Sequence, residues 1–193
     1  MISALVLAAG ESKRMGQPKM LLPWGKTTVI GKVIFTLFQA GLTDVCVVTG
    51  GNYTGVKEAL AEYNTKLVFN PDYADGEMLT SVKVGLKEIE GASEAALIVL
   101  GDQPQIEAGV VKIVMDSYLS ARPKIVVPSY QMHRGHPWLI DHALWNEITV
   151  LSPPNTLRDY LIQNQGIISY VNVNTPSILQ DLDTPREYLE QKP

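Results

Sequence analysis

The sequence predicts one α/β domain: a doubly wound, mostly parallel sheet with a small insertion at one edge. Short apolar runs alternate along the chain with longer segments of helical periodicity, as in strand–helix–strand repeats. Several of these runs are nearly continuous in Val, Ile, Leu and Ala, which is typical of strands covered on both faces. The chain has 193 residues, the size of one domain that can bury a core without disulfides. We therefore expect a single domain spanning residues 1–193.

The predicted strands are the apolar runs at residues 3–8, 45–49, 66–70, 95–100, 124–128 and 167–173. The predicted helices carry apolar side chains at helical spacing and cover residues 28–40, 80–90, 107–121 and 155–163. Gly41 ends the first of these helices, and Thr156 with Asp159 has the spacing of a capping box at the start of the fourth. Residues 129–151 break the pattern with a short strand at 138–140 and a short helix after Asp141, which predicts the insertion at the sheet edge.

Composition and charge exclude several classes of protein. Hydrophobic residues make up 46% and charged residues 19%, as in ordinary globular chains rather than disordered or fibrous ones. The net charge is −4, so no basic surplus suggests binding to nucleic acid. The single cysteine, Cys46, excludes an intramolecular disulfide and is expected to be a small core residue. No apolar run is long enough for a membrane helix, and the basic residues follow the apolar start instead of preceding it. We expect a cytoplasmic protein without a membrane partner.

The loop after the first strand has the composition of an anion-binding loop. It opens with small residues that let a ligand approach the backbone: Ala8, Ala9 and Gly10. It also carries three cations, which together with backbone amides suit a polyanion such as a triphosphate: Lys13, Arg14 and Lys19. The glycine spacing fits neither a Walker loop nor the dinucleotide fingerprint. The alternative is a solvated turn with ordinary surface lysines.

Two later segments offer carboxylates for a metal ion. Asp102 follows the fourth predicted strand, where a carboxylate is costly to desolvate unless it is paired or metal-bound. Near the end of the chain, Asp181 and Asp183 precede a predicted last helix that has its cap at Thr184 and Glu187 at the third position. Magnesium bound to phosphates needs only one or two protein carboxylates. The alternatives are a turn cap at Asp102 and a plain charged helix start near the end of the chain.

The motif Leu-Ala-Ala-Gly-x-Ser-x-Arg-Met-Gly-x-x-Lys, from Leu7 to Lys19, resembles the signature of nucleotidyltransferases with a Rossmann-like core. The segments Gly-Asp-Gln-Pro at 101–104 and Asp-Leu-Asp-Thr-Pro at 181–185 resemble the metal motifs of the same family. The resemblance implies that Arg14 and Lys19 hold the nucleoside triphosphate and stabilise charge at the α-phosphate. It matches Asp102 and Asp183 to the Mg²⁺ ligands and makes Asp181 a weaker candidate. It also implies further nucleotide contacts along this loop, at Leu7, Ala8, Ala9, Gly10 and Ser12.

A second stretch resembles the part of these enzymes that contacts the base or the ribose. It contains Asn70 at the end of the third strand, then Gly76, and Ser81, which matches the serine at the start of the following helix. We therefore expect these three residues to bind the nucleotide. From the residues alone, Ser81 or Thr80 could equally be a simple helix cap.

The segment Arg134-Gly-His-Pro at 134–137 resembles the acceptor-binding stretch of the molybdenum cofactor cytidylyltransferases. The resemblance implies that Arg134 or His136 holds anionic groups of the acceptor. Trp138 departs from the family, which has small aliphatic residues there. A zinc site made of His133, His136 and His142 is the disfavoured alternative, because zinc needs three or four ligands in a defined geometry.

The whole resemblance implies transfer of CMP from CTP to the terminal phosphate of the molybdenum–pterin cofactor, with release of pyrophosphate and Mg²⁺ as cofactor. Ala9 and Gln103 favour CTP over GTP, because the related guanylyltransferases usually have other residues at both positions. A molybdenum hydroxylase apoenzyme is a further possible partner. Two alternatives remain open: a guanylyl- or other nucleotidyltransferase acting on GTP or on a sugar or alcohol phosphate, and a non-catalytic nucleotide- or cofactor-binding chaperone for molybdenum hydroxylases.

Overall fold

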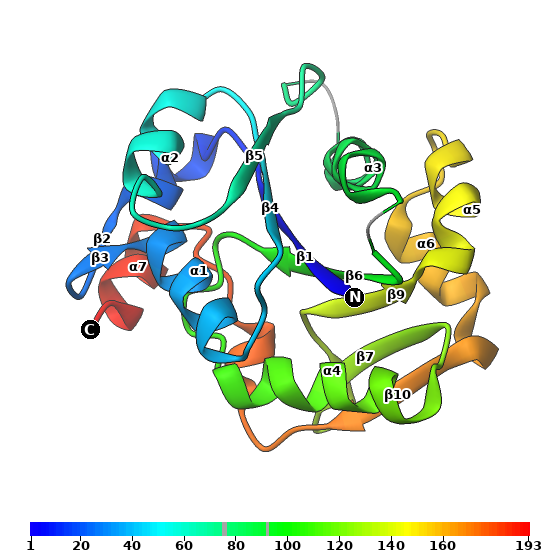
Figure 1. Cartoon of the computed structure of the whole chain (residues 1–193). Coiled ribbons are helices and arrows are strands. Elements are labelled where there is room, and N and C mark those ends of the chain that lie inside the picture. Colours follow the sequence, from blue (N-terminus) through cyan, green and yellow to red (C-terminus); the bar gives the residue numbers. More distant parts are fainter. Residues whose placement is uncertain (75–76, 92) are drawn as a thin grey trace.

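The computed structural model describes residues 1–74, 77–91 and 93–193, and a twisted mixed sheet forms its centre (Figure 1). The strands of this sheet are β1 (Ile2–Ala8), β4 (Val45–Thr49), β5 (Lys66–Phe69), β6 (Ala95–Leu100), β7 (Ile125–Tyr130), β8 (His133–Arg134), β9 (Trp138–Asp141) and β10 (Ile168–Asn172). They lie in the order β10-β7-β9-β6-β1-β4-β5, and β8 pairs with β7. The pairs of β1 with β4 and β6, of β4 with β5, and of β7 with β10 are parallel. The predicted doubly wound, mostly parallel sheet is confirmed.

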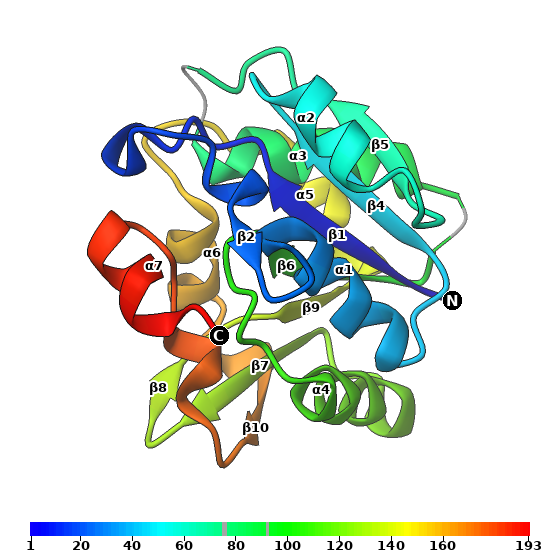
Figure 2. The same cartoon turned by 90° about the vertical axis from the view of Figure 1, so that its left-hand side faces the viewer.

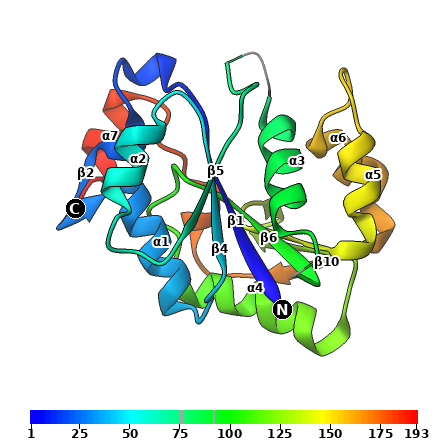
Figure 3. The same ribbon diagram turned by 45° about the horizontal axis from the view of Figure 1, so that its top comes forward.

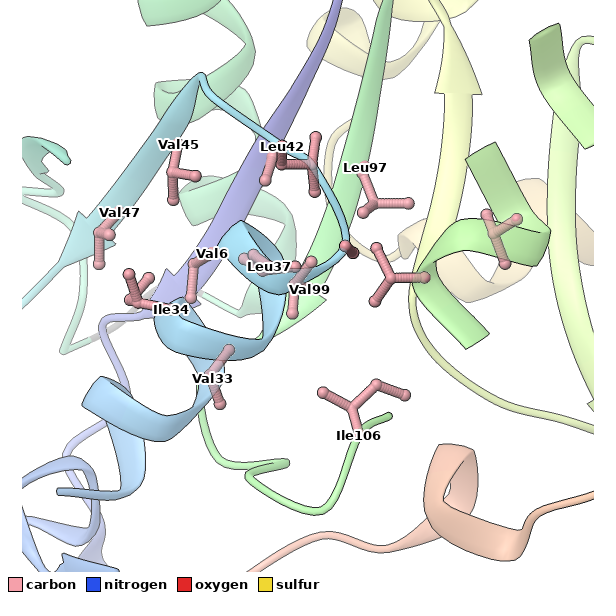
Figure 4. Packing of buried hydrophobic residues seen from close by; sticks show 14 of the residues in the cluster. Val6, Val33, Ile34, Leu37, Leu42, Val45, Val47, Leu97, Val99 and Ile106 are labelled. Carbon is pink, nitrogen blue, oxygen red and sulfur yellow. The ribbon is translucent and has the colours of Figure 1, made fainter. Parts of the chain in front are cut away.

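Helices cover both faces of the sheet (Figure 3). They are α1 (Val29–Gln39), α2 (Tyr53–Ala59), α3 (Met78–Ile89), α4 (Ala108–Ala121), α5 (Trp145–Val150), α6 (Leu157–Gln163) and α7 (Pro185–Gln191). Alternate residues of β1 supply two different cores. Ala4 and Val6 pack with α1, α2 and α4, whereas Leu5 and Leu7 pack with α3, α5 and α6. Figure 4 shows the first of these cores, with Val6 beside side chains of α1.

The segment 129–151 is placed differently from the prediction. Instead of covering an edge, its strand β9 lies inside the sheet between β6 and β7 and is antiparallel to both. The physical reason is burial on both faces: Leu139 packs into the core on one face of the sheet, and Trp138 and Ile140 pack into the core on the other. The edge is formed by β10, whose Tyr170 is exposed. The expected short helix after Asp141 is present as a 3₁₀ turn followed by α5.

The predicted capping box at the start of α6 and the predicted cap of the last helix, α7, are present. Thr28, predicted as the first residue of its helix, instead caps α1 by accepting a hydrogen bond from the backbone of Gly31. Helix α3 begins at Met78, two residues before its predicted start, so neither Thr80 nor Ser81 is its N-cap. Gly41 follows α1 with a φ of 94°, in the left-handed region that favours glycine. Helix α2 was not predicted. No helix within the described residues is long and apolar enough to span a membrane.

A third, smaller core fixes the end of the chain next to the loop that follows β1. It joins Met15, Leu22, Trp24 and Val29 to Leu182, with Tyr188 of α7 packed against it. The hydroxyl of Tyr188 donates to the carbonyl oxygen of Pro23 at 2.7 Å. Pro23 belongs to the short strand β2 (Pro23–Trp24), which pairs with β3 (Thr27–Thr28). Figure 2 shows α7 beside β2. This packing carries the residues just before α7 to the carboxyl ends of β1 and β6.

Candidate active site

The loop after β1 folds back on itself and fixes Lys19. Ser12 has a φ of 56°, and its hydroxyl accepts a hydrogen bond from the backbone N–H of Lys19 at 3.1 Å. Gly16 has a φ of 69°, as expected for a glycine that allows an unusual turn. Ser12 was predicted to contact a nucleotide, and in the structure its side chain positions the lysine of its own loop.

The start of this loop leaves room beside the backbone. Ala8 and Ala9 are buried, and a Cβ added to Gly10 would meet nothing within 4 Å. The side chain of Leu7 belongs to the core, and its carbonyl oxygen accepts a hydrogen bond from the N–H of Gly101 at 3.0 Å. Leu7 therefore ties the loop after β6 to the loop after β1, while the space next to Gly10 is free for a ligand.

Four charged side chains from three distant segments meet at this edge of the sheet. The ammonium group of Lys19 contacts a carboxylate oxygen of Asp102 and lies 3.3 Å from Oδ1 of Asp183. Nη2 of Arg14 lies 2.8 Å from Oδ2 of Asp183. The side chains of Lys19 and Asp102 are only 12% and 16% exposed. The four residues singled out as catalytic or metal-binding are thus brought together.

The environment keeps Lys19 charged. Burial by itself lowers the pKa of a lysine, but the nearby carboxylates of Asp102 and Asp183 outweigh that effect and raise the pKa above 10.5. Lys19 is therefore protonated at neutral pH and neutralises part of the negative charge of the two aspartates.

Asp181 is placed differently from the other two aspartates. It accepts a hydrogen bond from the side chain of Gln103 at 2.6 Å, and Gln103 is itself only 3% exposed. Burial raises the pKa of Asp181, and the hydrogen bond from Gln103 offsets this only in part. The N–H of Leu182 also donates to the carbonyl oxygen of Asp102 at 3.3 Å. These contacts hold the segment before α7 against the loop after β6.

The donor set fits a hard divalent cation. Asp102 and Asp183 offer carboxylate oxygens, which Mg²⁺ and Mn²⁺ prefer, and both already face the cationic group of Lys19. The described residues contain no group of three or more His, Cys, Asp and Glu side chains that could hold a metal without other ligands. An ion held by this pair would need further oxygen ligands, such as phosphates and water.

Asn70 and Ser81, predicted to bind the nucleotide, are brought together by hydrogen bonds inside the protein. The amide of Asn70 donates to the hydroxyls of Thr80 and Ser81 at 3.1 and 3.0 Å, and its oxygen accepts from the N–H of Asp72. Asn70 is fully buried, so it fixes the path of the chain between β5 and α3. Gly76, the third member of this set, lies outside the described residues.

A close contact at the end of β4 was not predicted from the sequence. A Cβ added to Gly50 would collide with the carbonyl oxygen of Ala9 and would lie 2.8 Å from side-chain atoms of Tyr73. One added to Gly51 would lie 3.0 Å from the ring of Tyr73. A glycine pair directly after a buried strand is the signal that could have located this contact. It shows that the loop after β4 packs against both the loop after β1 and Tyr73 of the segment after β5.

Residues 134–136 line a cavity of about 860 Å³ that Gln103 and Asp181 also line. The ring of His136 stacks on that of Trp138, with centroids 4.0 Å apart. Burial lowers the pKa of His136 to about 4, so this imidazole is neutral at pH 7 and cannot hold an anion as a cation. Arg134 lies with its guanidinium 5.4 Å from the ring centroid of Tyr170. His142 lies against Trp145 with the two ring planes tilted by 53°, and the described residues include no group of three metal-binding side chains, which argues against the zinc site.

The parallel sheet, the lysine-bearing loop after β1 and the paired carboxylates at its carboxyl edge define a nucleotidyltransferase of the Rossmann-like class. The chain belongs to the MobA-like NTP transferase family, whose domain model matches residues 4–167. The resemblance found in the sequence is thereby confirmed.

Relatives with different names are similar to nearly the whole chain. The chain is 28% identical over 192 residues to the molybdenum cofactor cytidylyltransferase of Escherichia coli, covering 99% of this chain and 95% of that protein. It is 26% identical over 195 residues to the nicotine blue oxidoreductase of Paenarthrobacter nicotinovorans, covering 95% and 92%. Among solved structures, the complex of Rv0371c from Mycobacterium tuberculosis with manganese matches with a TM-score of 0.82 at 26% identity, over 98% of this chain and 96% of that one.

Proposed function

We propose that the protein transfers CMP from CTP to the terminal phosphate of the molybdenum–pterin cofactor and releases pyrophosphate. The observation that carries the proposal is the cluster of Arg14, Lys19, Asp102 and Asp183 next to a cavity large enough for an acceptor. The cytidylyltransferase of Escherichia coli, similar over nearly the full length, supports the choice of nucleotide and acceptor.

The charged residues divide into two roles. Arg14 and Lys19 would contact the triphosphate and stabilise the charge that develops as the bond to the leaving pyrophosphate breaks. Asp102 and Asp183 would hold a divalent cation, Mg²⁺ in our proposal, which when bound supplies further neutralisation of the phosphates. The manganese complex of the similar Rv0371c supports a divalent-metal role.

The reaction needs little proton transfer. An oxygen of the acceptor phosphate forms a bond to the α-phosphorus of CTP. The bond between that phosphorus and the oxygen bridging the α- and β-phosphates breaks, so that pyrophosphate leaves. A phosphate monoester has its second pKa near ~6, so the attacking oxygen is already ionised at pH 7. Positioning and charge neutralisation by the four clustered side chains would then supply most of the rate enhancement.

The preference for CTP rests on Ala9 and Gln103, as the sequence suggests. The carbonyl oxygen of Ala9 lies close to Gly50. This close approach leaves little space between the backbone at Ala9 and the loop after β4. Gln103 donates to Asp181, so we assign its influence to the shape of the loop after β6 instead of direct contact with the base.

The similarity to nicotine blue oxidoreductase favours a second candidate, a redox enzyme built on the same fold. The cluster of two cations and two carboxylates supports nucleotidyl transfer instead, because it matches the charge of a triphosphate with a divalent metal. Catalysis of a redox reaction of nicotine blue would distinguish this candidate.

The test is pyrophosphate release with each of the four nucleoside triphosphates, with Mg²⁺ and with or without the molybdenum–pterin cofactor. We expect release only when CTP, metal and acceptor are all present. The variant Asp102→Asn should lose about 10²- to 10³-fold in kcat, whereas Asp116→Asn, on the exposed face of α4, should not. CTP binding without pyrophosphate release would instead support the chaperone, and release with GTP would support a guanylyltransferase.

A further inference from the structure

A hydrogen-bonded pair, Gln103 and Asp181, joins the two segments that carry the clustered aspartates. Nε2 of Gln103 donates to Oδ1 of Asp181 at 2.6 Å, across 78 positions of sequence. Gln103 directly follows Asp102, and Asp181 lies two residues before Asp183. Each partner of the pair is therefore a near neighbour of one carboxylate that faces Lys19.

The donor of this pair, Gln103, is held in place by its own backbone. Its N–H donates to the carbonyl oxygen of Leu100 at 3.4 Å, and its carbonyl oxygen accepts from the N–H of Ile106 at 3.2 Å. The residue is buried, so water has little access to replace Asp181 as the acceptor of its amide. The side chain of Gln103 thus defines where Asp181 lies.

The segment that carries the other partner is anchored by Leu182, which lies between the two aspartates. The side chain of Leu182 is fully buried in the small core next to the loop after β1, and its N–H donates to the carbonyl oxygen of Asp102 at 3.3 Å. On either side of this anchor, Asp181 contacts Gln103 and Asp183 contacts the cations of the cluster. The backbone hydrogen bond attaches the two segments at one point, and the side-chain pair attaches them at a second, which limits their relative rotation.

Asp181 does not complete a metal site as a third carboxylate. Within residues 1–74, 77–91 and 93–193, no three His, Cys, Asp or Glu side chains are grouped so that they could hold a metal ion. Oδ1 of Asp181 is instead engaged by the amide of Gln103. Because that amide is neutral, it fixes Asp181 without adding a charge to the cluster around Lys19.

The geometry of a two-carboxylate site depends on contacts of this kind. A small divalent cation such as Mg²⁺ demands near-ideal octahedral geometry, so both carboxylates must be held at a suitable separation. Contacts that orient the ligands of a metal, without touching it, typically change its affinity about 10- to 100-fold when they are removed. The pair of Gln103 and Asp181 is placed to act in this way, since it joins the loop of Asp102 to the segment of Asp183.

We propose that Gln103 and Asp181 are positioning residues that set the separation of Asp102 and Asp183, and thereby the affinity of these two carboxylates for a divalent cation. Neither positioning residue contacts the cation itself. The inference rests on the proposed function, because that function assigns the cation to Asp102 and Asp183.

The test measures Mn²⁺ binding from the signal of free Mn²⁺ in electron paramagnetic resonance, so that no turnover is needed. The Kd is determined with and without α,β-methylene CTP, an analogue that cannot release pyrophosphate. Asp181→Ala and Gln103→Leu remove the hydrogen bond, whereas Asp181→Asn keeps an oxygen that accepts from Gln103. The double variant Gln103→Glu with Asp181→Asn restores the bond with donor and acceptor exchanged, at the net charge of the wild type.

The matched control is Glu107→Ala. Oε1 of Glu107 accepts from the hydroxyl of Thr175 at 2.6 Å, so this variant also removes a carboxylate and a hydrogen bond between the same two parts of the chain. Glu107 is exposed at the start of α4, outside the charged cluster. Asp102→Asn is the reference for loss of a metal ligand, and far-ultraviolet circular dichroism verifies that each variant is folded.

We expect Asp181→Ala and Gln103→Leu to raise the Kd for Mn²⁺ about 10- to 100-fold. Gln103→Glu alone should do the same, because it places two carboxylates together. Asp181→Asn, the double variant and Glu107→Ala should stay within about threefold of wild type. If Asp181→Ala fails to fold, the comparison of Gln103→Glu with the double variant still decides the question.

Two results would overturn the inference. One is a wild-type Kd in Gln103→Leu and Gln103→Glu. The other is a loss of affinity in Asp181→Asn and in the double variant as large as that in Asp102→Asn, because a direct metal ligand, unlike a positioning residue, is not replaced by an amide or by the exchanged pair.

The outcome for the pair is separable from that for the proposed function. Mn²⁺ affinity that falls in Asp102→Asn but not in the pair variants would retain the metal site and remove the positioning role. Pair-dependent Mn²⁺ binding without any pyrophosphate release from CTP would retain the positioning role and remove the transferase. A Kd that Asp102→Asn leaves unchanged would overturn both the metal role and the positioning role.

Discussion

Replacing Lys19 by methionine tests the charged cluster most severely. The change leaves Asp102 and Asp183 facing each other without the ammonium group that contacts both. Removing one partner of a buried ion pair costs about 3–5 kcal/mol. Here Asp183 keeps Arg14 and is 31% exposed, so we expect a smaller loss, about 2 kcal/mol. For a chain of this size that corresponds to a fall in Tm of about 4–8 °C.

The assay is thermal unfolding followed by circular dichroism, with Lys112→Met on the exposed face of α4 as the matched control. Because the folded-state pKa of Lys19 is raised above 10.5, its contribution to the free energy of unfolding is complete below pH 10.5. That contribution is lost as the pH rises through the higher folded-state value, so the difference between wild type and variant should shrink in strong alkali. Added Mn²⁺ should raise the Tm of the variant more than that of the wild type, since a cation can then replace the ammonium group. A Tm at pH 7 within 1 °C of the wild type would refute this view of the cluster.

Three further predictions concern packing. Gly135→Ala should lose about 1–3 kcal/mol of stability, because the new Cβ would collide with the carbonyl oxygen of Ile178; chemical denaturation measures this. Gly109 lies in α4, and a Cβ added there would meet nothing within 4 Å. Gly109→Ala should therefore gain about 0.5–1 kcal/mol of stability. Equal changes in the free energy of unfolding of the two variants would contradict the packing described here. Burial raises the pKa of Cys46 to about 12, so a thiol reagent at pH 8 should label it only in denaturant. Rapid labelling of the native protein would show that β4 is not covered as described.

Local features were predictable because they depend on neighbours in the sequence. The caps at Thr156 and Thr184 and the buried strands follow from short patterns, and they agree with the structure. The place of β9 could not be predicted in the same way. A run of three apolar residues can lie at an edge or inside a sheet, and its pairing with β6 and β7 is fixed by long-range contacts.

The same distinction applies to the site. The resemblance selected Lys19, Asp102 and Asp183, but their contact depends on the small core around Leu182, which joins segments 164 residues apart. The neutral state of His136 likewise follows from tertiary burial and not from its neighbours in the chain.

The most direct test of the central claim is the fate of labelled phosphorus in the reaction. The protein is incubated with Mg²⁺, the molybdenum–pterin cofactor and CTP labelled at either the α- or the γ-phosphate, and the products are separated. We predict that the α-label enters a pterin product heavier by one cytidylyl group, while the γ-label appears only in pyrophosphate. An α-label that never enters the pterin, or a γ-label that does, would contradict cytidylyl transfer by this protein.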